Sequence, residues 1–175
     1  ITLMGKDRSE ISDRESAEKI GFVMQSPDSQ TVCDKVSAEL AFGLESFGVK
    51  SGEIQSRVGE MAAFFGIEPL YDRDISTLSG GQKQLVALCS VMATDPDILL
   101  LDEPTAQLDP IAARELLGIL DRLNKEMGVT IIIAEHDPEE LFDSCDKILY
   151  LAKGKTEFFG TSALTAKYFV ENALE

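Results

Sequence analysis

The chain has 175 residues, and its 44% hydrophobic and 27% charged content is ordinary for one domain with a substantial core. The formal net charge of −15 creates a field that repels polyanions, so no nucleic-acid partner is expected. No apolar run reaches the roughly 18–20 residues that cross a bilayer, and the three widely spaced cysteines without a CxxC pair favour a reducing compartment over a disulfide framework.

The first thirty residues predict two strands separated by a charged segment. Residues 1–5 read as a short strand, and residues 19–25 alternate enough to be a buried one. Pro27 and Asp28 then signal a loop. Gln25 therefore stands at a strand end, where its amide could reach a phosphate or a metal-bound water, or could simply be a polar strand terminus.

Two amphipathic helices are expected next, over residues 32–47 and 54–65. Each carries an apolar stripe at helical spacing, and Gly48 and Gly66 are plausible C-terminal stops. These stripes favour core packing over a binding surface. A polar connection over residues 69–77 follows.

A glycine-rich turn opens the helix predicted over residues 82–93. The first amides of a helix lack internal partners and carry the positive end of the helix dipole. Exposed amides at Gly80 and Gly81 therefore predict an anion-binding end, and Ser79 is a suitable N-cap.

The apolar strand Ile98–Leu101 ends in Asp102-Glu103. Four consecutive apolar residues predict burial on both faces, as in a parallel sheet. An acidic pair at the end of such a strand can hold Mg²⁺ and a water, or it can be a solvated strand exit.

The remaining elements continue the alternation of helix and strand. We expect a loop ending at Asp109, a helix over 111–127, a strand over 129–134, a helix over 138–144, strands over 147–152 and 155–159, and a helix over 162–173. This alternation predicts an α/β fold with a parallel sheet. Gln25, Asp102 and the only histidine, His136, all follow strands, so they are expected at one edge of the sheet.

These motifs resemble the ATP-binding-cassette (ABC) ATPases. Residues 78–82 match the signature of that family letter for letter, and residues 98–103 match its Walker B strand with the adjacent glutamate. The resemblance implies a P-loop NTPase-like parallel sheet with an inserted helical subdomain. It makes the chain a single partial ABC ATPase domain, with the helical subdomain at about 31–77 and the RecA-like core at 1–30 and 78–175.

The resemblance also implies an ATPase with ATP and Mg²⁺ as cofactors. Asp102 would hold Mg²⁺, Gln25 would reach the metal and the nucleotide, Glu103 would be the general base, and His136 would contact the γ-phosphate. In the family, the signature acts across a dimer with a second ATPase subunit, identical or different. The resemblance implies that ATP held by that subunit would be contacted by Ser79, Gly80, Gly81 and Gln82, with Asp109 at the same interface.

The phosphate loop of the family, G-x-x-x-x-G-K-[ST], does not occur in this sequence. We expect it upstream of Ile1, so the chain reads as an N-terminally truncated ATPase without its Walker A loop and central strand. Such a fragment should bind ATP poorly and be inactive alone. If the loop is absent natively, the chain would instead be a non-catalytic assembly module.

Residues 25–30 and 39–43 resemble a subgroup, the ATPases of energy-coupling-factor importers for cobalt, nickel or vitamins. This implies an integral membrane coupling protein as partner, a peripheral location on the cytoplasmic face of the membrane, and uptake of a metal ion or vitamin. Asp34, Glu39 and Glu45 would form the acidic side of the docking groove. The alternative is a soluble ABC ATPase of translation or DNA repair. Three positions depart from the family pattern: Ser26, Leu85 and Gln107.

Overall fold

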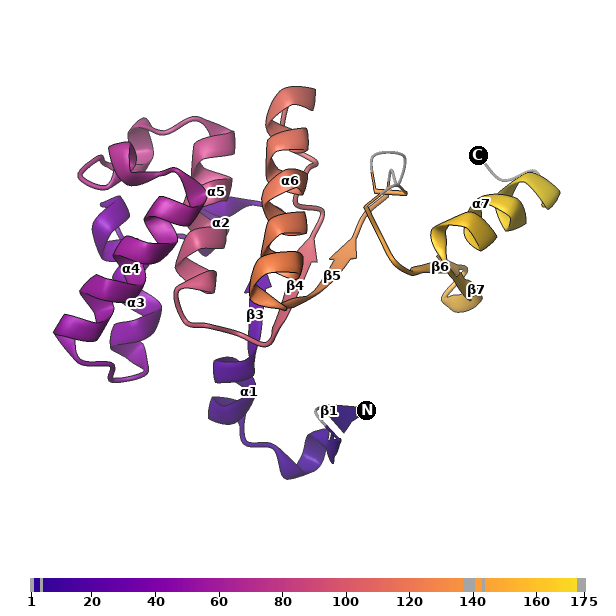
Figure 1. The fold of residues 1–175 in the computed structure, drawn as a ribbon, viewed down its shortest axis with the longest axis horizontal. Helices are drawn as coiled ribbons and strands as arrows, with labels where there is room; N and C mark the ends of the chain where they lie inside the picture. The colour runs from indigo at the N-terminus through magenta and orange to yellow at the C-terminus, as the bar shows by residue number, and fades with distance from the viewer. Residues whose placement is uncertain (1, 4, 137–140, 143, 173–175) are drawn as a thin grey trace. The chain divides into compact units, whose positions relative to one another are not determined.

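The computed structural model describes the chain except for residues 1, 4, 137–140, 143 and 173–175 (Figure 1). It divides into two compact units, residues 1–135 and residues 136–175. None of the helices in the described ranges is long and apolar enough to span a bilayer.

The first unit is built on a parallel sheet in the order β3-β4-β5, which confirms the predicted α/β class. The strands are β3 (Ile20–Val23), β4 (Ile98–Asp102) and β5 (Thr130–Ala134), and their register sets Phe22 beside Leu100 and Leu100 beside Ile132. Helices separate the strands along the chain, because a parallel pair needs a crossover connection. All three strands therefore end at the same edge.

One face of this sheet is buried and the other is partly open. Val23, Leu99 and Leu101 are at most 2% exposed, whereas Phe22 and Ile132 are 46% and 56% exposed. Leu100, between those two, is only half-buried, so the prediction that β4 is buried on both faces is wrong. The cause is one-sided covering: helix α5 (Gly80–Met92) packs against the face that carries Gly21.

Gly21 of β3 lies close against α5. A Cβ atom there would lie 2.4 Å from Val91 Cγ1 and 3.2 Å from Pro96 Cγ. We expect Gly21→Ala to destabilise the chain by about 1–3 kcal/mol through overpacking. Gly59→Ala is the control, because no atom lies within 4 Å of its Cβ position. Urea unfolding checks this, and equal stability of the two variants would contradict the packing argument.

The first long helix after β3 starts later than predicted, at residue 36 instead of 32, whereas the helix after it starts earlier, at residue 51 instead of 54. Residues 27–30 form the separate short helix α2 (Pro27–Gln30), and the next helix is α3 (Val36–Ser46). Helix α4 (Ser51–Phe65) ends, as expected, at Gly66, whose φ of 67° favours glycine. The buried side chains that join α3 and α4 to α5 include Val36, Leu40, Leu44, Ile54, Val58, Phe65, Leu88 and Met92.

Glu39 is buried, so it cannot lie on an acidic docking groove as predicted. It is 5% exposed, and its Oε2 accepts hydrogen bonds from the backbone amides of Val32 and Cys33 at 3.0 and 2.9 Å. The carboxylate thereby satisfies two donors of the segment that leads into α3. Asp34 and Glu45 are exposed.

Short elements and helix α6 complete the first unit. Helix α6 (Pro110–Met127) connects β4 to β5 and agrees with its predicted range. Its buried residues are Ala113, Leu116, Leu117, Leu120 and Leu123. The shorter elements are β1 (Thr2–Leu3), β2 (Lys6–Asp7), η1 (Arg8–Glu10), α1 (Asp13–Lys19), η2 (Glu68–Leu70) and η3 (Ile75–Thr77).

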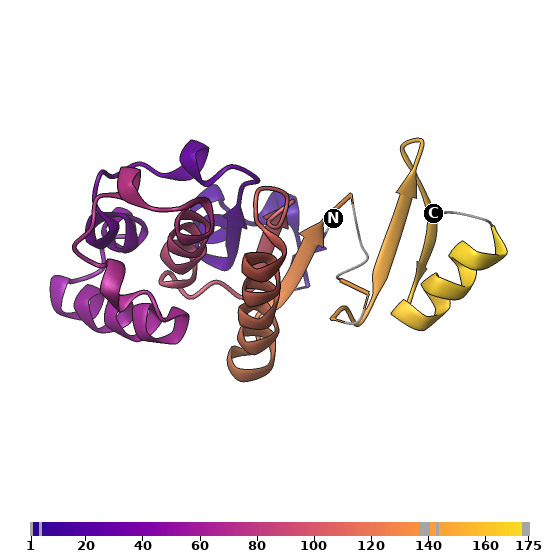
Figure 2. The ribbon, with the colours of Figure 1, turned by 90° about the horizontal axis from the view of Figure 1, so that it is seen from above.

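The described part of the second unit contains an antiparallel hairpin and one helix. Strands β6 (Ile148–Ala152) and β7 (Lys155–Gly160) pair, and α7 (Ser162–Glu171) lies along them (Figure 2). Aromatic rings join the helix to the strands, with Phe158 stacked on Tyr168 at 4.6 Å between centroids. The helix predicted over 138–144 lies mostly outside the described residues.

Candidate functional site

The candidate site of the first unit lies at the carboxyl ends of the three parallel strands. Gln25 follows β3, Asp102 ends β4 with Glu103 next to it, and Glu135 follows β5. Parallel strands bring these positions to one edge, where ligands of α/β proteins usually bind.

Gln25 and Glu103 are in direct contact. The Gln25 Nε2 group donates a hydrogen bond of 2.6 Å to Glu103 Oε2. These residues are 78 positions apart in the chain, and the pairing of β3 with β4 is what brings them together. The amide therefore holds one oxygen of the predicted general base, and the Gln25 Oε1 atom is the one that can face a cation.

The backbone at Glu103 adopts an unusual conformation. Its φ is 44°, in the left-handed region that non-glycine residues rarely occupy. The Glu103 amide donates to the Ala134 carbonyl at 2.9 Å, so the end of β5 holds this residue in place. Strained backbone of this kind is concentrated at functional sites, where the surrounding structure enforces it.

Asp102 is an exposed residue at the last pair of the sheet, opposite Ala134. Together with Glu103 and Gln25 it supplies oxygen donors, which are the ligands that Mg²⁺ prefers. In the described ranges, no three His, Cys, Asp or Glu side chains converge on a metal position. Carboxylate and amide oxygens fit Mg²⁺, which usually keeps water or phosphate as its other ligands. That this chain binds Mg²⁺ stays a prediction.

A second link at this edge joins the loop after Glu103 to the end of β5. The Thr105 hydroxyl donates to Glu135 Oε1 at 2.6 Å, and the Thr105 amide donates to the same oxygen at 3.3 Å. Sequence reasoning missed this contact. The available signal was an acidic residue directly after an apolar, β-branched strand.

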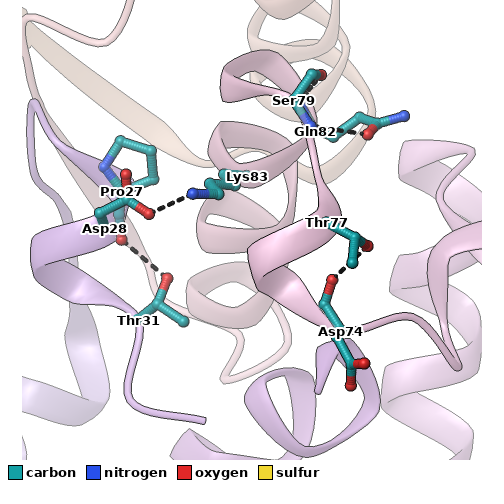
Figure 3. A network of polar contacts seen from close by, with 8 residues as sticks. All are labelled: Pro27, Asp28, Thr31, Asp74, Thr77, Ser79, Gln82 and Lys83. Atoms are coloured by element: carbon teal, nitrogen blue, oxygen red, sulfur yellow. Dashed lines mark hydrogen bonds and ion pairs between the residues drawn. The ribbon is translucent and has the colours of Figure 1, made fainter. Parts of the chain in front are cut away.

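The glycine-rich turn is the N-terminus of α5, as predicted. Ser79 Oγ accepts a hydrogen bond from the Gln82 amide, and the Gln82 side chain accepts one from the Ser79 amide (Figure 3). This capping box fixes the turn. Gly80 and Gly81 lie in the first turn, where amides lack helical partners. Binding of an anion at this turn stays a prediction.

Asp109 caps the N-terminus of α6. Its Oδ1 accepts from the amides of Ile111 and Ala112 at 2.9 and 3.0 Å. This explains the residue locally through helix capping. A role for Asp109 at an interface between subunits stays a prediction.

His136 is the residue that follows Glu135, and it is the first residue of the second unit. Its membership of the site at the edge of the sheet therefore also stays a prediction.

Comparisons with known proteins agree with these motifs. A family model described as ABC transporter matches residues 1–106. An ABC transporter ATP-binding protein of Bacillus thuringiensis subsp. konkukian is 46% identical over 151 residues, which cover 86% of this chain. The energy-coupling factor transporter ATP-binding protein EcfA1 of Symbiobacterium thermophilum is 40% identical over 144 residues, or 82% of this chain. The chain spans 27% and 50% of the lengths of these two relatives.

A solved structure extends the similarity to nearly all of the chain. CbiO1 from Clostridium perfringens, described as part of the ABC transporter complex CbiONQ, superposes with a TM-score of 0.86 and 33% identity. The match covers 98% of this chain and 70% of CbiO1. Sequence, fold and family model agree, and the chain belongs to the ABC transporter ATP-binding family.

Proposed function

We propose that this chain supplies the hydrolytic part of an ATPase that energises an importer of the energy-coupling-factor type. The observation that carries the proposal is the 2.6 Å hydrogen bond from Gln25 to Glu103, beside Asp102 and at the carboxyl edge of a parallel sheet. An oriented carboxylate next to oxygen ligands for a cation is what hydrolysis of a phosphoanhydride requires.

The residues at the edge of the sheet would have different roles in hydrolysis. Asp102 and the Gln25 amide oxygen would hold Mg²⁺, which supplies charge neutralisation at the phosphates when it is bound. Glu103 would accept a proton from the attacking water as general base. The hydrogen bond from Gln25 directs one oxygen of Glu103, and the strained backbone fixes where that carboxylate points. His136 would contact the terminal phosphate.

A second ATPase subunit, identical or different, is part of the proposal. The Ser79 hydroxyl and the amides of Gly80, Gly81 and Gln82 would close over ATP held by that subunit, with Asp109 at the same interface. The support is the capped helix terminus, since unpaired amides and the helix dipole favour an anion there. We also propose that residues 31–77 act as the helical subdomain and the rest as the RecA-like core of one partial domain.

The membrane partner is proposed to be an integral coupling protein, which places this chain on the cytoplasmic face of the membrane. The support is that CbiO1, a structural relative, is described as part of the ABC transporter complex CbiONQ, and that another relative is named an energy-coupling factor transporter ATP-binding protein. On α3 and the segment before it, Val32 and Phe42 are 65% and 42% exposed, near exposed Asp34 and Glu45. This mixed apolar and acidic surface suits basic helices of a partner. The proposed cargo is a metal ion or a vitamin.

Metal removal tests the enzymatic part of the proposal. The protein as its gene encodes it should release phosphate from ATP with Mg²⁺ and lose that activity in EDTA, because the charge on the phosphates is then no longer neutralised. Restoring Mg²⁺ should restore the rate. Metal-independent hydrolysis, or none under any condition, would contradict the proposal, and the second result would favour an assembly module.

A further inference from the structure

The conformation of residues 24–30, the segment that carries Gln25, is stabilised by contacts with β3 and α5. Helix α2, which follows Gln25, has four residues, too few to be stable alone, and its N-cap Ser26 makes no side-chain capping bond. Gln30 ties its far end back to β3: the Gln30 Oε1 atom accepts from the Met24 amide at 2.9 Å, and its Nε2 donates to the Phe22 carbonyl at 3.1 Å. These bonds close the segment into a compact loop.

One ion pair connects this loop to the start of α5. Lys83 Nζ lies 2.6 Å from Asp28 Oδ1 (Figure 3). The Lys83 side chain is only 18% exposed, so its stem is covered and its ammonium group is directed toward Asp28, which is 67% exposed. Lys83 comes directly after the capping box of Ser79 and Gln82, and its amide donates to the Ser79 carbonyl at 2.9 Å.

The position of this lysine is unfavourable for the helix itself. A positive charge in the first turn is repelled by the helix dipole, and burial of its stem restricts the side chain. The stability of α5 therefore does not explain a lysine here, whereas a contact with Asp28 does.

We propose that Asp28 and Lys83 are positioning residues that hold the loop of Gln25 at a set distance from the glycine-rich turn. Lys83 is bonded to the capped turn at Ser79 and to Asp28, the backbone of residues 25–28 connects Asp28 to Gln25, and Gln25 is bonded to Glu103. A shift of α5 would therefore move the carboxylate of Glu103, which is proposed as the general base. The expected effect on hydrolysis rests on the proposed function, whereas the link between the loop of Gln25 and α5 through Asp28 and Lys83 does not.

Hydrogen exchange of the chain tests the link directly. In Lys83→Met, the amides of Met24, Ser29 and Thr31 should exchange about two- to fivefold faster. The reason is that loss of a partly exposed ion pair raises the population of the open loop, from which these amides exchange. Exchange in the middle of α3 should not change. The same result is expected for Asp28→Asn, which removes the charge at the exposed partner without altering the burial around Lys83.

Rescue and a matched control separate positioning from general destabilisation. The charge swap Asp28→Lys with Lys83→Asp should restore slow exchange. Lys19→Met removes a comparable ion pair, Lys19 with Asp97 at 2.8 Å, and should leave the three amides unchanged. Unchanged exchange in both Lys83→Met and Asp28→Asn, or equal acceleration in Lys19→Met, would overturn the proposal.

A kinetic measurement extends the test to the proposed reaction. In the protein as its gene encodes it, Lys83→Met should lower kcat for ATP hydrolysis with little change in KM, and the charge swap should recover kcat. A protein that shows the exchange effect but hydrolyses no ATP would refute the proposed function and leave the link intact. Normal kcat together with unchanged exchange would refute the link alone.

Discussion

Replacement of Glu103 by Gln is expected to lower kcat for ATP hydrolysis by about 10²–10⁴-fold, the usual contribution of a general base. The amide of Gln is far less basic than a carboxylate, so it cannot take a proton from water. Its carbonyl oxygen can still accept the hydrogen bond from Gln25 Nε2, so the geometry of the site should survive. Phosphate release under saturating ATP and Mg²⁺ measures the loss in the protein as its gene encodes it.

The control for this variant is Glu68→Gln, which removes one charge at an exposed site in η2. Its kcat should equal that of the parent protein. Retention of nucleotide binding in Glu103→Gln would place the defect in the chemical step. A kcat within twofold of the parent would contradict the assignment of Glu103 as general base.

The substitution Glu39→Lys is expected to destabilise the chain by about 3 kcal/mol or more. An ammonium group cannot accept from the amides of Val32 and Cys33, so two donors lose their partner. The new charge would also be buried at a position that is 5% exposed, without a counter-ion. The free energy of unfolding in urea, followed by circular dichroism, measures the effect.

Two further substitutions on α3 separate the loss of the hydrogen-bond acceptor and the burial of a charge from a charge reversal as such. Glu39→Gln keeps an oxygen acceptor and should lose much less stability. Glu45→Lys makes the same charge reversal at an exposed site of the same helix and should stay within about 0.5 kcal/mol of the parent. If Glu39→Lys were as stable as Glu45→Lys, the buried carboxylate would not be structural.

Local sequence patterns predict most of the helices and strands, and the polar residues that follow the strands. The predicted range of helix α6 agrees with the structure to within one residue, because the spacing of its apolar residues is a local signal. Ser79 was predicted as N-cap from the glycines behind it, and the structure shows that cap. Local signals of this kind depend only on neighbours along the chain.

Which polar groups contact one another depends on how distant segments pack. Periodicity predicts a helix at Glu39, and the resemblance to importer ATPases implied an exposed groove there, but two backbone amides of the preceding segment donate to its carboxylate and the residue is buried. The contacts of Gln25 with Glu103 and of Asp28 with Lys83 join residues 78 and 55 positions apart. Such contacts arise from strand pairing and crossover packing, and the local pattern of either partner carries no information about the other.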